Sequence, residues 1–266
     1  MARSARISAW GRSLVAVLLL MLCSLPHSWA QKAVRLDTTV FRPAQLIAPG
    51  ALIVSGVAIH GLAHDSWDYS VRNTAQGWRA NGGEVPFYEE ILRYVPAVPL
   101  IVDLGLGLTG VPAVHNLHDR FIEAGLASAL VGGSALILKK IIVSPRPDGT
   151  DLHSFPSGHS CISFMGAELI RMEYGWGWGA GAYAVAGSVA FLRLYQDRHW
   201  LSDLLLGAGI GILGAHAGRW LLDPTKKLLN IVTGSGYTEK PAPEVAVTPY
   251  YDPFSGAVCT ALAFRF

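Results

Sequence analysis

The chain has 266 residues, a formal net charge of +2, 51% hydrophobic residues and only 15% charged residues. Its mean hydropathy of +0.35 favours a helical membrane protein with one substantial domain. The small net charge, with no dense Lys/Arg run outside the extreme N-terminus, excludes nucleic acid as a predicted partner.

The first 30 residues have the pattern of an export signal. Three arginines precede the apolar run 14–22, and small residues, Ser28 and Ala30, stand at the two positions that a signal peptidase reads. We therefore predict a signal peptide over residues 1–30. The alternative is an uncleaved first membrane helix, for which the apolar run is short.

Six apolar segments follow, separated by short polar joints. They predict an all-α fold, a helical bundle that is a polytopic membrane protein with about five or six apolar helices. Most segments are about 17 to 22 residues long, which suffices to cross a bilayer. Several contain Gly and Ala at spacings that let helices approach closely in lipid. The segments are 46–62, 94–111, 121–142, 159–172, 176–194 and 201–222.

Composition divides the chain after residue 30 into three parts. Residues 31–115 hold the first apolar segments and a polar stretch, 63–93, which predicts a loop or short surface helices and carries no motif. Residues 116–224 hold the other segments and every motif. Residues 225–266 predict a short non-helical tail, because four prolines exclude a long helix. Larger and smaller side chains alternate over residues 258–266, which predicts a strand that could belong to a hairpin.

Three polar clusters interrupt the apolar sequence between Lys139 and Asp203. In the last cluster, His199 and Asp203 stand four residues apart at the start of an apolar helix, so they share one face. The carboxylate can accept a hydrogen bond from one ring nitrogen and leave the other as an unprotonated nucleophile. Such a pair often has only a structural role. The catalytic interpretation is favoured here by Arg193 just upstream and by the other two clusters.

The middle cluster, Pro156-Ser157-Gly158-His159, stands where a polar loop gives way to an apolar helix. Unpaired N–H groups and the helix dipole favour an anion at such a start. Gly158 allows close approach of phosphate oxygens, and His159 is placed to donate a proton to a leaving oxygen. The alternative is a capped helix with an incidental histidine.

The first cluster is Lys139 with Arg146-Pro147. Arginine offers a planar fork to two phosphate oxygens, and lysine contributes a point charge. Lys140 competes for the lysine role, but a basic residue at a helix end can also extend to the membrane surface, which is the interpretation we prefer for Lys140. Together the clusters supply cations, two imidazoles and a carboxylate, a set that suits covalent attack on phosphate.

These motifs resemble those of the type 2 phosphatidic acid phosphatases, which share their site with acid phosphatases and vanadium haloperoxidases. The family pattern is Lys, six residues, Arg-Pro; then Pro-Ser-Gly-His; then Ser-Arg, five residues, His, three residues, Asp. The chain meets this pattern in order and spacing, except that Leu192 stands where the pattern has Ser. The resemblance implies catalysis by His199, His159 and Asp203, and phosphate binding by Lys139, Arg146, Ser157, Gly158 and Arg193.

The resemblance implies a phosphatase that uses no metal and no cofactor. His199 would form a phosphohistidine, Asp203 would orient it, and His159 would protonate the leaving group. The expected substrate is a lipid phosphate monoester or a polyprenyl pyrophosphate, with lipid A a candidate because related bacterial members dephosphorylate it. Three alternatives are a soluble periplasmic acid phosphatase, a vanadate-dependent haloperoxidase and a non-enzymatic membrane protein whose buried charges line a pathway.

The site residues stand at four ends of predicted helices, which are therefore expected to meet on one face. Arg171 and Lys226-Lys227 mark the opposite ends, which the positive-inside tendency places in the cytoplasm. We predict a bacterial inner-membrane protein, in contact with membrane lipids, whose site faces the periplasm; the alternative is a soluble periplasmic protein. With an exported N-terminus, either 46–62 or 94–111 should not span. The sequence leaves the oligomeric state open.

Overall fold

The computed structural model describes residues 41–82, 94–108, 111–233, 244–251 and 258–265. The signal peptide predicted over residues 1–30 lies outside this part of the chain. The chain divides into two compact units at Asp223.

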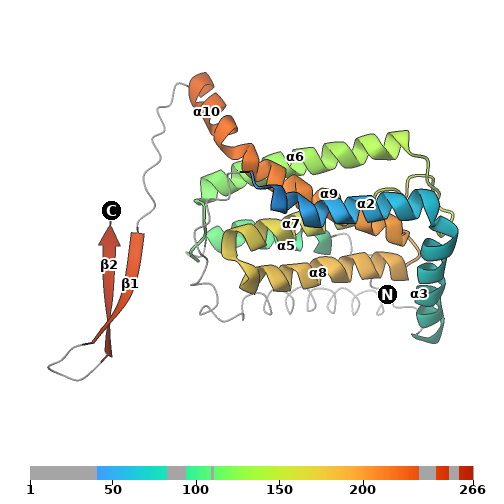
Figure 1. Cartoon of the computed structure of the whole chain (residues 1–266), viewed down its shortest axis with the longest axis horizontal. Helices are drawn as coiled ribbons and strands as arrows, with labels where there is room; N and C mark the ends of the chain where they lie inside the picture. Colours follow the sequence, from blue (N-terminus) through green and yellow to red (C-terminus); the bar gives the residue numbers. More distant parts are fainter. Residues whose placement is uncertain (1–40, 83–93, 109–110, 234–243, 252–257, 266) are drawn as a thin grey trace, which may run out of the picture. The chain divides into compact units, whose positions relative to one another are not determined.

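The first unit is a helical bundle, as predicted, and each predicted apolar segment forms a helix close to its predicted bounds. The polar stretch 63–93, for which a loop or short surface helices were predicted, contains a π-helical turn and a helix of 14 residues. The elements are η2 (Pro43–Leu46), α2 (Ile47–Leu62), η3 (His64–Asp68), α3 (Tyr69–Gly82), η4 (Val95–Ala97), α5 (Val98–Leu108), α6 (Leu117–Ile141), α7 (Gly158–Tyr174), α8 (Trp176–Tyr195) and α9 (Leu201–Trp220) (Figure 1).

Helix α9 packs against α2, α6 and α7, and its glycines explain how. A Cβ at Gly207 would stand 2.7 Å from the carbonyl oxygen of the residue that caps α7. At Gly209 it would stand 2.9 Å from a carbonyl oxygen of α2, and at Gly218 2.8 Å from one of α6. Only glycine lets backbones approach so closely. This packing fixes the helix whose first turn carries Asp203.

Three described helices are long and apolar enough to cross a membrane: Pro43–Leu62, α6 and α9. Helix α5 has 11 residues. It is therefore about 16 Å long, roughly half of the 30 Å hydrocarbon core. Of the two early segments, 94–111 is thus the one whose helix is too short to cross by itself. The three long helices and the composition indicate a membrane protein.

The C-terminal unit differs in part from the predicted non-helical tail. Helix α10 (Leu222–Thr233) is present where the tail was predicted to begin, at residue 225. Pro224 lies in the first turn of α10, where proline is tolerated, and the other prolines come later. Strands β1 (Glu244–Tyr251) and β2 (Val258–Arg265) then form an antiparallel pair.

Paired charges are buried at the end of α9. Arg219 donates from Nε to Oε1 of Glu123 at 2.7 Å and also bonds Glu173, and none of these side chains is more than 1% exposed. Arg120 pairs with Asp103 at 3.1 Å, and both side chains are again buried. Buried charges are costly unless they are paired. These pairs therefore join α5, α6, α7 and α9.

We expect Arg219→Met to lower the melting temperature of the purified protein strongly. The change leaves Glu123 and Glu173 buried without the cation that neutralises them, a loss of about 3–5 kcal/mol for a buried pair. Lys227→Met, which removes an exposed cation of α10, serves as the control and should leave the melting temperature unchanged. Equal melting temperatures for the two variants would show that this network does not hold the helices together.

Candidate active site

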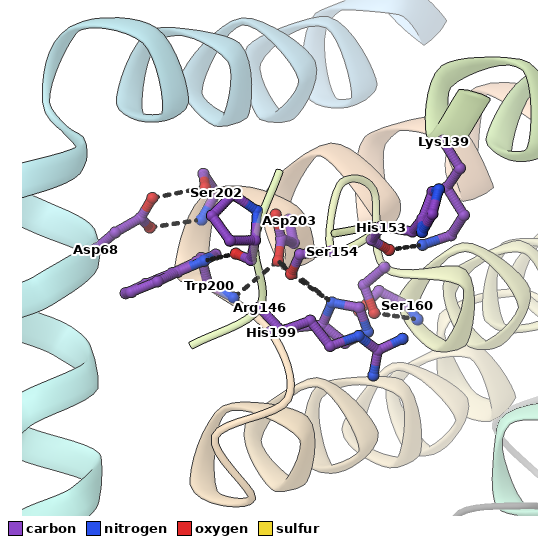
Figure 2. A network of polar contacts seen from close by, with 12 residues as sticks. Asp68, Lys139, Arg146, His153, Ser154, Ser160, His199, Trp200, Ser202 and Asp203 are labelled. Carbon is purple, nitrogen blue, oxygen red and sulfur yellow. Dashed lines mark hydrogen bonds and ion pairs between the residues drawn. The ribbon is translucent and has the colours of Figure 1, made fainter. Parts of the chain in front are cut away.

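The three polar clusters lie at helix ends; Figure 2 shows Lys139 and Arg146 of the first cluster near His199 and Asp203 of the last. Lys139 is in the last turn of α6, the middle cluster begins α7, Arg193 is in the last turn of α8, and Asp203 is in the first turn of α9. The charges of Arg193, Arg146 and Lys139 all act on the imidazole of His159. The structure thus brings the predicted cations to the side chain that was predicted to donate a proton.

His199 stands just before α9 and is held by Asp203. Its Nδ1 lies 3.2 Å from Oδ2 of Asp203, and the two side chains are 2% and 0% exposed. The same oxygen accepts the backbone N–H of Trp200 at 2.8 Å and the hydroxyl of Ser154. These donors fix the carboxylate. Because Nδ1 faces Asp203, Nε2 is the nitrogen left for chemistry.

Ser154 is a functional residue that the sequence did not predict. Its hydroxyl donates to Asp203 and lies 3.3 Å from Nδ1 of His199, and its side chain is fully buried. The one available signal was its place two residues before the middle cluster. A single serine in a polar loop is too common to be singled out on that basis.

We expect Ser154→Ala to lower kcat for phosphate release by about 10- to 100-fold. The change removes a hydrogen bond to a charged group, which contributes about 1.5–3 kcal/mol. Steady-state kinetics on the purified protein measures the effect. Ser188→Ala is the matched control, because Ser188 is exposed and bonds only the carbonyl oxygen of Ala184 in its own helix. An unchanged kcat in Ser154→Ala would remove Ser154 from the site.

The middle cluster begins α7 as predicted. Ser157 is the N-cap, and its hydroxyl oxygen accepts the N–H of Ser160 at 3.4 Å. The N–H of Ser157 donates to the carbonyl oxygen of Asp203 at 3.1 Å, which ties the starts of α7 and α9 together. A Cβ at Gly158 would meet no described atom within 4 Å. The start of α7 is therefore open beside Gly158, where an anion can approach its N–H groups.

The predicted cations have acceptors on the neighbouring loops. Lys139 donates from Nζ to the carbonyl oxygen of His153 at 2.6 Å, and Nε of Arg146 lies 2.8 Å from a carboxylate oxygen of Asp151. Arg193 donates from Nη1 to the side chain of Gln196 at 3.2 Å. These contacts hold the cations beside the predicted site, within reach of a bound phosphate.

Leu192 lies in α8 directly before Arg193. Its side chain has no hydrogen-bonding group, so the bond that Ser supplies in the family pattern is not available at this position.

Burial favours the neutral form of both imidazoles. It lowers the pKa of His199, although the hydrogen bond that the imidazole donates to Asp203 opposes this effect. His199 is therefore neutral at pH 7, as a nucleophile must be. His159 lies in the first turn of α7, outside the three helices long enough to cross a membrane. Burial and the nearby cations lower its pKa to about 4.

One group of possible metal ligands exists among the described residues, and it lies away from the site. Ligand atoms of His115, Glu123 and Glu173 come within 4.8 Å of one another. Arg219 already binds both carboxylates, and His115 donates its backbone N–H to Glu173. Because a buried guanidinium already binds both carboxylates, this cluster is better suited to a structural role.

Comparison with known proteins adds a family to this geometry. Residues 121–225 match the family model of the PAP2 superfamily. The matched region contains every site residue predicted from the sequence, and the match confirms the predicted resemblance.

Two known proteins are also similar to this chain. The Lipid A 1-phosphatase of Porphyromonas gingivalis is 34% identical over 148 residues, which cover 53% of this chain and 33% of that protein. The chain therefore matches only about a third of that relative's length. The crystal structure of a transmembrane PAP2 type phosphatidylglycerolphosphate phosphatase from Bacillus subtilis matches with a TM-score of 0.42 and 22% identity, over 68% of this chain and 97% of that one.

Proposed function

We propose that the protein hydrolyses a lipid phosphate monoester or a polyprenyl pyrophosphate through a phosphohistidine. The observation that carries this proposal is the buried His199–Asp203 pair, which lies at the same end of the bundle as three cations and the open start of α7. A neutral imidazole oriented by a carboxylate is a nucleophile, and the cations match the charge of a phosphoryl group.

The reaction has two steps. In the first, Nε2 of His199 attacks phosphorus and the bond from phosphorus to the leaving oxygen breaks, while His159 gives its proton to that oxygen. In the second, water attacks the phosphohistidine, His159 takes up a proton from the water, and inorganic phosphate leaves. Lys139, Arg146 and Arg193 stabilise the charge on the phosphoryl oxygens in both steps.

The low pKa of His159 fits this cycle if binding of the phosphate raises it. The surrounding cations contribute to lowering the pKa of this imidazole. A bound phosphate dianion offsets their charge, so the pKa of His159 rises when substrate binds. His159 is then protonated at the moment when the leaving oxygen needs a proton, and neutral once phosphate has left.

Metal removal should leave the activity intact. The cations of the site neutralise the phosphoryl oxygens, so we expect the same rate of phosphate release with and without EDTA. Orthovanadate should inhibit, because it can occupy the phosphoryl site as an analogue of the transition state. Phosphate release measured in both conditions checks this prediction, and a strict requirement for Mg²⁺ would contradict it.

The substrate is best sought among bacterial membrane phospholipids. We favour lipid A phosphate, because the similar Porphyromonas gingivalis protein is a Lipid A 1-phosphatase. The test is phosphate release from lipid A, undecaprenyl pyrophosphate, phosphatidic acid and phosphatidylglycerophosphate, with wild type and His199→Ala. Release by wild type alone supports the proposal and ranks the substrates. No release from any of them would reject it, and halide oxidation with added vanadate would point instead to a haloperoxidase.

We also propose that the site faces the periplasm from the inner membrane, as the positive-inside tendency suggests. The start of α2 lies beside the end of α9 that is remote from the site. There Gln45, just before α2, accepts the indole N–H of Trp220 at 3.1 Å. Helix α2 ends where His60 stacks on Phe155, 4.3 Å between ring centroids, next to Ser154 of the site. Phe41 and the site therefore lie at opposite ends of the bundle.

A periplasmic site and a cleaved signal peptide are not compatible in a membrane-embedded bundle with this arrangement. A periplasmic site in a membrane-embedded bundle places Phe41 on the cytoplasmic side, whereas cleavage of a signal peptide after Ala30 would release Phe41 into the periplasm. Both hold together only for the soluble periplasmic form. The N-terminal sequence of the purified protein, together with its distribution after a high-salt wash of membranes, separates the two cases: an intact N-terminus in the membrane fraction supports the membrane-embedded form.

A further inference from the structure

We propose that Asp68 and Arg72 position the nucleophile by clamping the two ends of the segment from Asp197 to Ser202, which carries His199. Both residues come from η3 and α3, outside residues 121–225 that match the PAP2 superfamily. The proposal rests on the proposed role of His199 as the nucleophile.

Asp68 holds the end of the segment that leads into α9. Its carboxylate accepts the backbone N–H of Ser202 at 2.9 Å and the hydroxyl of Ser202 at 2.7 Å (Figure 2). Both residues are completely buried. On its other side, Asp68 lies 2.8 Å from Nδ1 of His64, which keeps the carboxylate in place. Ser202 is directly followed by Asp203, so this clamp also fixes the partner of His199.

Arg72 holds the other end of the segment. Its guanidinium binds Asp197 with two hydrogen bonds, at 2.7 Å from Nε and 2.6 Å from Nη2. Nη2 also donates to the carbonyl oxygen of Pro147 at 3.1 Å, which ties the loop after Arg146 to the same point. Asp197 has a φ of 62°, a left-handed conformation that costs energy for a residue other than glycine. The bidentate ion pair stabilises this turn.

The two clamps come from consecutive elements, η3 and α3. Asp68 and Arg72 are four residues apart, so their side chains project from neighbouring turns toward the same segment. Between the clamped ends, the Trp200 ring packs against His64 and Tyr69, with centroid distances of 4.6 and 5.0 Å. The backbone on both sides of His199 is thus held by η3 and α3, while Asp203 contacts the His199 ring and the backbone N–H of Trp200.

A displacement of His199 affects the chemical step more than it affects substrate binding. In-line attack requires Nε2 of His199 to be placed to a fraction of an ångström, and a displacement of about 1 Å can cost about 100-fold in rate. The cations that are proposed to bind the phosphate lie on other segments of the chain. One of them, Arg146, precedes the loop that Arg72 contacts at Pro147. Loss of a clamp should therefore lower kcat and change KM little.

The variants Arg72→Met and Asp68→Asn test the proposal in the full-length protein. We expect each to lower kcat by about 10- to 100-fold, with a change in KM of less than about threefold. Arg72→Lys keeps the charge but loses the two-pronged bond, so it should recover only part of the rate. Arg79→Met makes the same chemical change about 10 Å further along α3, and it should keep the wild-type kcat.

A second readout separates positioning from simple loss of folded protein. Rapid-quench measurement gives the rate constant of phosphohistidine formation, which misplacement lowers, and its amplitude, which loss of folded protein lowers. A reduced amplitude with the wild-type rate constant would overturn the proposal, as would a wild-type kcat in both clamp variants. If wild type forms phosphohistidine but the clamp variants are unaffected, only this proposal fails.

The imidazole of His199 can also be followed when no substrate is cleaved. In protein labelled with ¹⁵N-histidine, the signal assigned by its loss in His199→Ala reports the position of the ring. We expect Arg72→Met and Asp68→Asn to shift or broaden this signal, and Arg79→Met to leave it unchanged. An unchanged signal in both clamp variants would overturn the proposal whether or not the proposed function holds.

Discussion

His199→Ala should abolish phosphate release, with a loss of at least about 10⁴-fold in kcat. In the proposed mechanism, the change removes the atom that forms the bond to phosphorus. His159, at the start of α7, has the separate proposed role of proton donor. Phosphate release from the best substrate of the panel, measured at saturating concentration, gives the effect.

The control for this variant is His118→Ala. His118 is 65% exposed near the start of α6, at the end of that helix remote from Lys139, and it should be replaceable without loss of rate. Both variants should keep the wild-type melting temperature to within a few degrees. If His199→Ala kept substantial activity with the fold intact, the nucleophile would have to be another residue.

Asp203→Asn should lower kcat by about 10²- to 10⁴-fold while the fold is kept. An amide has nearly the shape of the carboxylate, but it can present an N–H group to His199 and so favour the wrong tautomer, with the proton on Nε2. It also brings no negative charge to stabilise the imidazole as it becomes positive in the phosphohistidine. The loss should appear in kcat, measured with the same substrate, and less in KM.

The contacts of Asp203 make this variant demanding, because the same oxygen accepts bonds from Trp200, Ser154 and His199. A melting temperature close to that of wild type would show that the amide keeps the bond from the backbone N–H of Trp200. A near-normal kcat in such a folded variant would mean that His199 does not depend on Asp203 for its orientation.

The apolar helices were predictable because each long apolar segment must bury its side chains or insert them into a membrane. The same logic failed for α10, whose sequence is amphipathic rather than apolar and has a proline, Pro224, in its first turn, where proline is tolerated. It also gave no clear prediction for α3, because the polar stretch 63–93 is compatible with a loop and with short surface helices. Neither helix carries a continuous apolar signal.

The site was predictable to the extent that its residues occur as closely spaced motifs. His199 and Asp203 share a helix face by spacing alone, and the middle cluster marks its own helix start. By contrast, Asp68 and Arg72 are separated from their partners by more than 100 residues of chain. The packing of α2 against α9, with close contacts at Gly56 and Gly209, and the packing of α3 against α8 bring them together. A single buried aspartate or arginine gives no such signal in a sequence.

Trapping the covalent intermediate tests the central claim most directly. Wild type is mixed briefly with substrate carrying a labelled phosphoryl group, quenched in alkali to preserve phosphohistidine, and digested for mass spectrometry. We predict one labelled peptide, containing His199 and phosphorylated on its imidazole, with the label lost on mild acid treatment and absent from His199→Ala. A label on another residue, or turnover with no labelled peptide under any quench time, would contradict the account.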